Sequence, residues 1–154
     1  MKIKEEYEKL KKKHSLPDFK ELDESFEVST IDREEFLLRE IRRKIDEKIE
    51  LYIKLLERLL QPDPSSLSDM YECKIFEDDE KDELYQLFKK LMYFDRFSIE
   101  TSVGENDKRS SDFINKFWRE WPEIKGKFLN FAKKAKDEWL KETKITDEER
   151  RYLG

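Results

Sequence analysis

Apolar residues recur at spacings of three and four along most of this chain, and this period limits its fold more than any other feature. One run covers residues 79–102, and another extends through 111–142 from Phe117 to Trp139. The clearest run covers residues 30–60, with apolar side chains at Leu38, Ile41, Ile45, Ile49, Tyr52, Leu56 and Leu59. The sequence therefore predicts an all-α, single-domain helical bundle over 1–154, with three long core helices and shorter terminal helices.

Capping residues, proline and glycine predict where the long helices begin and end. Ser29 and Thr30 are suitable N-caps for the first, and the Pro62-Asp63-Pro64 segment ends it because each proline lacks a backbone donor. Gly104 opens a turn, and we expect Ser110 or Ser111 to begin the third helix. Pro122 lies inside that helix, so a kink or a break is expected just before it.

The shorter helices are predicted from weaker patterns near the two ends. Residues 2–13 carry a short apolar stripe, and Ser15 with Pro17 is typical of a helix start. Thr146 and Glu149 form a capping box for a last helix through Tyr152. We expect the ends, 1–14 and 145–154, to be attached more loosely than the rest.

Composition indicates the cellular compartment and excludes some classes of protein. One Cys and one His cannot build a disulfide or a Cys/His zinc site. No stretch approaches the ~20 apolar residues that span a bilayer, and the charged N-terminus does not resemble a signal peptide. The surplus of Lys, Glu, Arg and Asp over Asn and Gln is typical of proteins from hot environments. We expect a cytoplasmic protein with no membrane association.

Charge is distributed unevenly along the chain, whose net charge is −5. Residues 62–83 carry nine acids against two lysines, which gives −7. Residues 115–144 carry nine bases against five acids (+4), and residues 1–13 carry six lysines against three glutamates (+3). Nucleic-acid-binding domains are usually basic overall, so this pattern favours a protein partner or self-association instead.

Two charged residues fall inside predicted apolar faces. Arg42 projects between Ile49 and Ile53, and Asp95 projects into the wide apolar arc of the 79–102 helix. A lone buried charge is very costly, so we predict that Arg42 and Asp95 form a buried polar pair, which Ser98 and Ser102 on the same face could join. This pair is interpreted as a structural salt bridge, with a functional carboxylate or a contact between subunits as the alternatives.

A pattern of acidic residues suggests one enzymatic alternative. Glu47-Lys-Ile-Glu50 and, after 26 intervening residues, Glu77-Asp-Asp-Glu80 resemble the ExxE…ExxD pattern of the all-helical nucleotide pyrophosphatases, the MazG-like group. The pattern departs from that family at Glu80, where the family has Asp. The resemblance implies a Mg²⁺-dependent hydrolase with Glu47, Glu50, Glu77 and Glu80 as metal ligands.

Aromatic residues between 113 and 139 are interleaved with lysine and arginine. Most continue the apolar stripe of the third helix, but Trp118 falls off it and is a candidate exposed anchor at an interface. No combination of residues predicts a catalytic site or a required cofactor. The sequence therefore favours a non-catalytic helical interaction or scaffold protein, with the Mg²⁺ hydrolase and an RNA- or ribosome-associated protein as alternatives.

Overall fold

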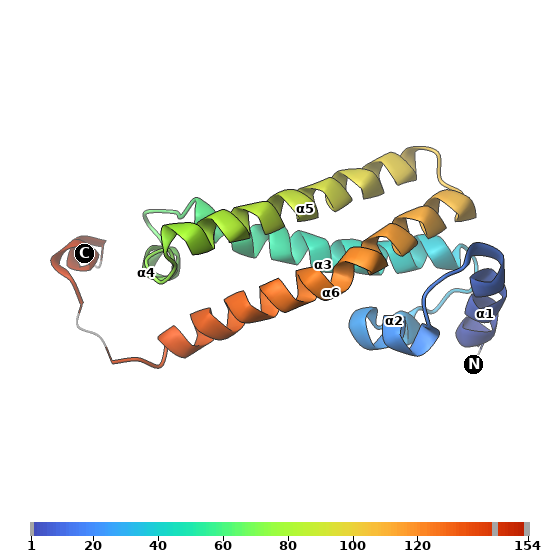
Figure 1. The fold of residues 1–154 in the computed structure, drawn as a ribbon, viewed down its shortest axis with the longest axis horizontal. Coiled ribbons are helices and arrows are strands. Elements are labelled where there is room, and N and C mark those ends of the chain that lie inside the picture. Colours follow the sequence, from blue (N-terminus) through green and yellow to red (C-terminus); the bar gives the residue numbers. More distant parts are fainter. Residues whose placement is uncertain (1, 143–144, 153–154) are drawn as a thin grey trace. The chain divides into compact units, whose positions relative to one another are not determined.

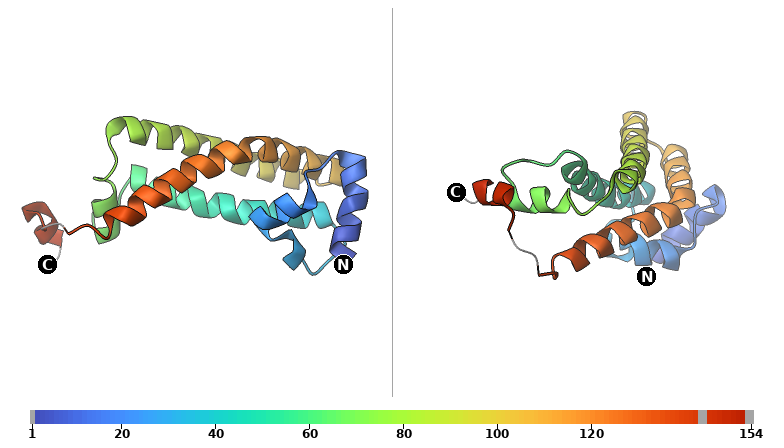
Figure 2. Two further views of the ribbon diagram at one scale, coloured as in Figure 1. Left: turned by 60° about the horizontal axis from the view of Figure 1, so that its bottom comes forward. Right: turned by 60° about the vertical axis from the view of Figure 1, so that its left-hand side comes forward.

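The computed structural model describes residues 2–142 and 145–152 and shows an all-α fold (Figure 1). The long helices are α3 (Leu37–Leu60), α5 (Asp78–Val103) and α6 (Asp107–Glu138). They pack together as the core, as the periodicity predicts, and lie side by side in the views of Figures 1 and 2. The shorter helices are α1 (Lys2–His14), α2 (Phe19–Phe26), the 3-10 helix η1 (Val28–Thr30), α4 (Leu67–Glu72) and α7 (Asp147–Tyr152).

The predicted apolar stripes are largely the buried faces. On α3 every member of the stripe is buried except Tyr52, which is half-buried and stacks on Phe128 of α6 with ring centroids 3.7 Å apart. On α6 the buried positions include Phe117, Trp121 and Ile124. Trp139, the last residue of the predicted stripe, follows the end of α6 and is exposed. The spacing of apolar residues thus identified the core faces of these two helices.

The start of α3 differs from the prediction, because Ser29 and Thr30 do not cap it. They lie in η1, where Ser29 N donates to Asp23 Oδ1 and Thr30 Oγ1 donates to Glu27 O. Ile31 is buried beyond η1 in an extended conformation, so the chain reaches the helix only at Leu37. Packing of Ile31 therefore outweighs the local capping preference.

The start of α6 also differs from the prediction, by one turn. Asn106 Oδ1 accepts a hydrogen bond from Arg109 N, so Asn106 takes the capping position predicted for Ser110 or Ser111. Both serines are buried within the helix. Of the kink or break expected just before Pro122, the break is absent, because α6 continues through Pro122.

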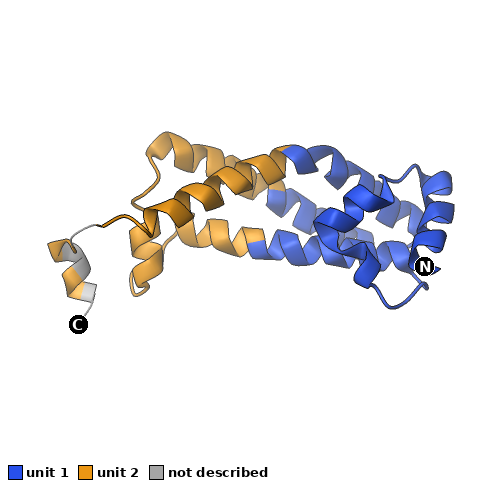
Figure 3. Ribbon diagram, turned by 90° about the horizontal axis from the view of Figure 1, so that it is seen from below, with its two compact units in different colours: residues 1–51, 91–122 blue, residues 52–90, 123–154 orange. Residues whose placement is uncertain are grey.

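The chain forms two compact units, coloured separately in Figure 3. Unit 1 comprises residues 1–51 and 91–122, and unit 2 comprises residues 52–90 and 123–154. Each long helix contributes one segment to each unit. Unit 1 contains α1 and α2. The Tyr7 hydroxyl of α1 donates to Pro17 O, just before α2, over 2.7 Å. Unit 2 contains α4 and α7.

None of the helices among the described residues is long and apolar enough to cross a membrane. The long helices instead alternate buried and charged positions with a helical period. The short helix predicted between Thr146 and Tyr152 is present as α7. Its predicted capping partner, the side chain of Glu149, lies outside the described part of the chain.

Candidate functional site

Arg42 forms the centre of a buried polar network in unit 1, but with partners other than the predicted one. It is 5% exposed. Its Nη1 donates to Ser98 Oγ over 2.7 Å and to Asp46 Oδ2 over 3.2 Å, and its Nη2 donates to Glu105 Oε1 over 2.6 Å. Ser98 Oγ donates in turn to Asp46 Oδ2 over 2.6 Å. The network therefore links α3, α5 and the turn before α6.

Asp95 does not belong to the ion pair that the sequence predicts. Its carboxylate binds the neighbouring Arg96 and remains partly exposed. The buried positions of α5 include Leu91, Phe94 and Ser98, whereas Ile99 is 53% exposed. The core face of α5 is thus narrower than its apolar arc, and Asp95 lies beside that face.

Asp46 is the titratable group that this environment perturbs most clearly. Burial raises its pKa from the ordinary value to about 6, although the Ser98 hydrogen bond and the Arg42 charge lower it. The negative charges of Asp95 and Glu50 raise it further. Asp46 Oδ1 is buried without a hydrogen-bond partner in the described chain, so this oxygen is free to take the proton. The network is a structural link with one pH-sensitive member.

Trp118 is a half-buried packing residue, not the exposed anchor that the sequence predicts. Its ring lies edge-on to Phe26 of α2, with centroids 6.4 Å apart. Phe26 also contacts the rings of Phe117 and Trp121. Because α2 covers this side of α6 within unit 1, a tryptophan outside the apolar stripe still finds an aromatic partner.

The four proposed metal ligands belong to two different units. Glu47 and Glu50 are exposed on α3 in unit 1, whereas Glu77 and Glu80 lie at the start of α5 in unit 2. Within residues 2–142 and 145–152, no group of three or more His, Cys, Asp or Glu side chains is placed to hold a metal ion. The described geometry therefore adds no support to the hydrolase alternative.

Glu77 and Glu80 have a local role at the start of α5. Glu80 Oε1 accepts the backbone N–H of Glu77 over 3.0 Å, as in a capping box. Both oxygens of Glu80 also accept from Lys134 Nζ of α6 over 2.7 Å, and this hydrogen bonding holds the pKa of Glu80 below its usual range. Glu80 thus ties α5 to α6 within unit 2.

An acid-lined groove of about 820 Å³ lies along the end of α3 and the first half of α5 in unit 2. Three carboxylates and one lysine line it, which gives a net charge of −2, and none of the three carboxylates forms an ion pair with another described residue. Leu60, Phe88 and the exposed Tyr85 supply apolar surface. The four charged residues are Glu57, Asp78, Lys81 and Asp82.

Sequence reasoning predicted the charge of this region but not the groove. Asp78 and Asp82 belong to the acid-rich segment 62–83. Tyr85 and Phe88 lie beside the buried stripe of α5, and their rings stack with centroids 6.4 Å apart. Their exposure depends on which half of the apolar arc faces the core, and the sequence does not specify this.

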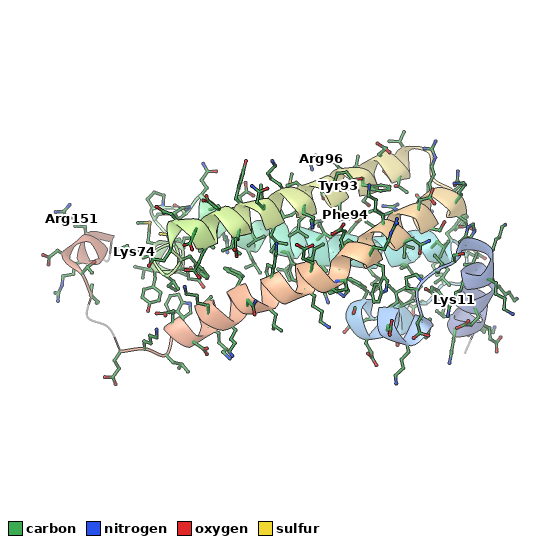
Figure 4. All side chains as sticks on the ribbon, in the orientation of Figure 1. Lys11, Lys74, Tyr93, Phe94, Arg96 and Arg151 are labelled. Carbon is green, nitrogen blue, oxygen red and sulfur yellow. The ribbon has the colours of Figure 1, made fainter. Side chains whose placement is uncertain are left out.

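A second groove, of about 620 Å³, lies in unit 1 between α5 and α6. Three cations line it, namely Arg96, Lys116 and Arg119. Two of them interact within the chain: Lys116 Nζ lies over the Tyr93 ring, 4.8 Å from the centroid, and Arg96 binds Asp95. Tyr93 and Arg96 are labelled on α5 in Figure 4. Glu100 and Asp112 reduce the net charge of the lining to +1, which is small for a surface that attracts RNA.

Unit 1 contains the Arg42 network and a nearly neutral groove, and unit 2 contains an acidic groove with exposed aromatic surface. No protein-family model, curated protein or solved structure matches this chain.

Proposed function

We propose that this chain is a non-catalytic interaction protein whose acidic groove in unit 2 binds a basic amphipathic helix of a partner protein. One observation carries the proposal: exposed aromatic surface lies directly beside carboxylates that have no ion-pair partner in the described chain. Exposed apolar surface with a charged rim is typical of protein-binding sites.

The shape of the groove favours a helix as the bound element. Its walls are two helices, α3 and α5, and an amphipathic helix commonly places its apolar face in such a groove. Leucine or phenylalanine side chains at i, i+3 and i+7 of the partner would contact Leu60, Tyr85 and Phe88. Lysines on its flanks would lie against Glu57, Asp78 and Asp82. Tyr85 is the expected anchor because tyrosine is enriched among the residues that dominate binding energy.

The basic helices of this chain are less suitable occupants. The helix α1 already buries its apolar face through Ile3 and Tyr7, and α6 buries Ile124 and Phe128. A second copy could offer Leu129, which is exposed on α6 between Lys125 and Lys133, but no apolar stripe. A partner with a free apolar face fits the groove better, and self-association is an outcome that the test distinguishes.

The test uses a labelled synthetic helix of about 18 residues, or five turns, with leucines at helical spacing and lysines elsewhere. Fluorescence anisotropy would measure its binding to the full chain. We expect Tyr85→Ala to weaken binding about tenfold, as expected for an interface hot spot. The matched control is Tyr93→Ala, because Tyr93 is 48% exposed on the same helix and Tyr85 is 49% exposed.

Two results would contradict the proposal. One is equal binding of the peptide and of a scrambled peptide with the same composition but no apolar face. The other is equal weakening by Tyr85→Ala and Tyr93→Ala. Native mass spectrometry of the free chain completes the test, because a dimer that Tyr85→Ala dissociates would identify the occupant as a second copy.

A further inference from the structure

The groove between α5 and α6 in unit 1 combines an aromatic surface with cations and takes no part in the proposed function. Its volume of about 620 Å³ is within the usual range for small-molecule sites. Tyr93 is 48% exposed, and the half-buried ring of Phe97 lies edge-on to it, with centroids 6.0 Å apart. Aromatic side chains beside cations commonly bind nucleotides, because every base has a face that stacks.

The cations gather around Tyr93 at one end of the groove. Lys116 Nζ donates to the Tyr93 hydroxyl over 2.5 Å, so this ammonium group is held at the edge of the ring. Arg119 lies one turn further along α6 and is exposed, and its guanidinium forms no hydrogen bond or ion pair with another described residue. Asp95 partly neutralises Arg96. This end of the groove therefore offers Lys116 and Arg119 to an anion such as a phosphate monoester.

The acids lie at the other end of the groove. Because a short turn joins α5 to α6, Glu100 and Asp112 both lie at the end nearer this turn (Figure 1). Asp112 is paired with Lys108 over 3.4 Å, whereas Glu100 forms no ion pair with another described residue. Glu100 is seven residues from Tyr93, or about 10 Å along the helix. The groove is thus suited to an elongated ligand with an anion at one end and a hydrogen-bond donor at the other.

We propose that this groove binds a nucleoside monophosphate whose base carries an amino group, as adenine does. The phosphate accepts hydrogen bonds from Lys116 and Arg119. The base stacks on the surface formed by Tyr93 and Phe97, and its amino group donates to the Glu100 carboxylate. The acids near the turn would repel the further phosphates of a longer chain, which favours a single nucleotide over RNA.

The experiment titrates the full chain with adenosine monophosphate (AMP) and follows backbone amide resonances by NMR. We expect the amides of Tyr93, Phe97 and Lys116 to shift with saturation. Arg119→Gln should weaken AMP binding about tenfold, because it removes a charge-assisted hydrogen bond to the phosphate. The matched control is Arg109→Gln, since Arg109 is exposed on the same helix but does not line the groove. Urea unfolding of both variants would show that each remains folded.

Three related ligands test the parts of the assignment. Ribose 5-phosphate lacks the base and adenosine lacks the phosphate, so each should bind about tenfold more weakly than AMP. Inosine monophosphate carries an oxygen in place of the amino group, and the wild type should bind it about threefold more weakly. Glu100→Gln should remove this preference, because an amide can donate to the oxygen as well as accept from the amino group.

Four results would overturn the proposal. Ribose 5-phosphate binding as tightly as AMP would indicate a general anion site, and equal weakening by Arg119→Gln and Arg109→Gln would indicate non-specific attraction. Equal affinity of the wild type for AMP and inosine monophosphate would contradict the role of Glu100. AMP that shifts no amide of the groove would show that the groove does not bind it. None of these results bears on the peptide groove, which lies in unit 2.

Discussion

Unit 1 and unit 2 place their charged residues differently around the same kind of helical core. In unit 1 the Arg42 guanidinium is buried and joined to Asp46, Ser98 and Glu105. In unit 2 the ion pair between Glu80 and Lys134 is partly open to solvent, and the groove carboxylates have no ion-pair partner among the described residues. In unit 1 the buried guanidinium therefore joins three segments of the fold, whereas in unit 2 the proposed function depends on the carboxylates of the groove that form no ion pair with another described residue.

The largest expected effect is that of removing the centre of the unit 1 network. Arg42→Ala should lower the free energy of unfolding by about 3 kcal/mol, because it removes a buried guanidinium and leaves the half-buried Asp46 carboxylate and the buried Ser98 hydroxyl without their shared partner. Urea unfolding would measure it. The control is Arg43→Ala, since Arg43 is exposed and pairs with Glu40 on the same helix. An equal effect of the two substitutions would refute the contrast between the units.

Through Asp46, the same network should make the free energy of unfolding depend on pH. The pKa of Asp46 is about 6 in the folded protein and close to 4 when unfolded, so the folded chain binds this proton more tightly. Its contribution to stability is therefore fully present below about pH 4 and is lost as the pH rises through about 6.

Asp46→Asn should abolish this dependence. Between about pH 7 and pH 4 the wild type should gain up to about 3 kcal/mol of unfolding free energy relative to Asp46→Asn. Urea unfolding of both proteins across this range would measure the difference. A difference that does not change with pH would show that Asp46 is not perturbed.

Substituting one glycine in each unit by alanine tests whether there is space around that position for a side chain. A Cβ added to Gly126 on α6 of unit 2 meets no atom within 4 Å, so Gly126→Ala should raise the unfolding free energy by about 1 kcal/mol through helix propensity. Gly104 in unit 1 follows the last residue of α5, so Gly104→Ala should bring no such gain in helix propensity, although the exposed Arg109 side chain can move away from the added Cβ. Thermal unfolding would compare them, and a loss of stability in Gly126→Ala would indicate that this face is covered.

The smallest effect is expected for the partly exposed ion pair between Glu80 and Lys134 in unit 2. A double-mutant cycle with Glu80→Gln and Lys134→Met should give a coupling energy of about 0.5 kcal/mol, because solvent screens the pair. Urea unfolding of the four proteins would supply this value. A coupling as large as the effect of Arg42→Ala would remove the distinction between the two units.

The helices could be predicted from the sequence because their periodicity is long and regular, but contacts across helices could not. Arg42 was correctly identified as buried from its place on α3. Its partners were not, because Glu105 lies in a turn and the apolar arc of α5 is too wide to show which part faces the core. Ile99 and Asp95 fall on the outer part of that arc, whereas Ser98 falls on the core side.

The candidate sites depend on tertiary placement even more strongly. The acid surplus of 62–83 indicated a partner surface, but the groove also requires Leu60 and Glu57 from α3. The sequence predicts Ser110 as an N-cap. In the structure Asn106 takes the capping position one turn earlier, and Ser110 is buried within the helix.

The most direct test of the central claim is a charge exchange across the groove of unit 2. A labelled lysine-rich amphipathic peptide and its glutamate-rich counterpart would each be titrated against the wild type and against Asp78→Lys/Asp82→Lys. We predict that the wild type binds the lysine-rich peptide and that the variant binds the glutamate-rich peptide instead. If the variant still prefers the lysine-rich peptide, the acidic groove is not the binding site.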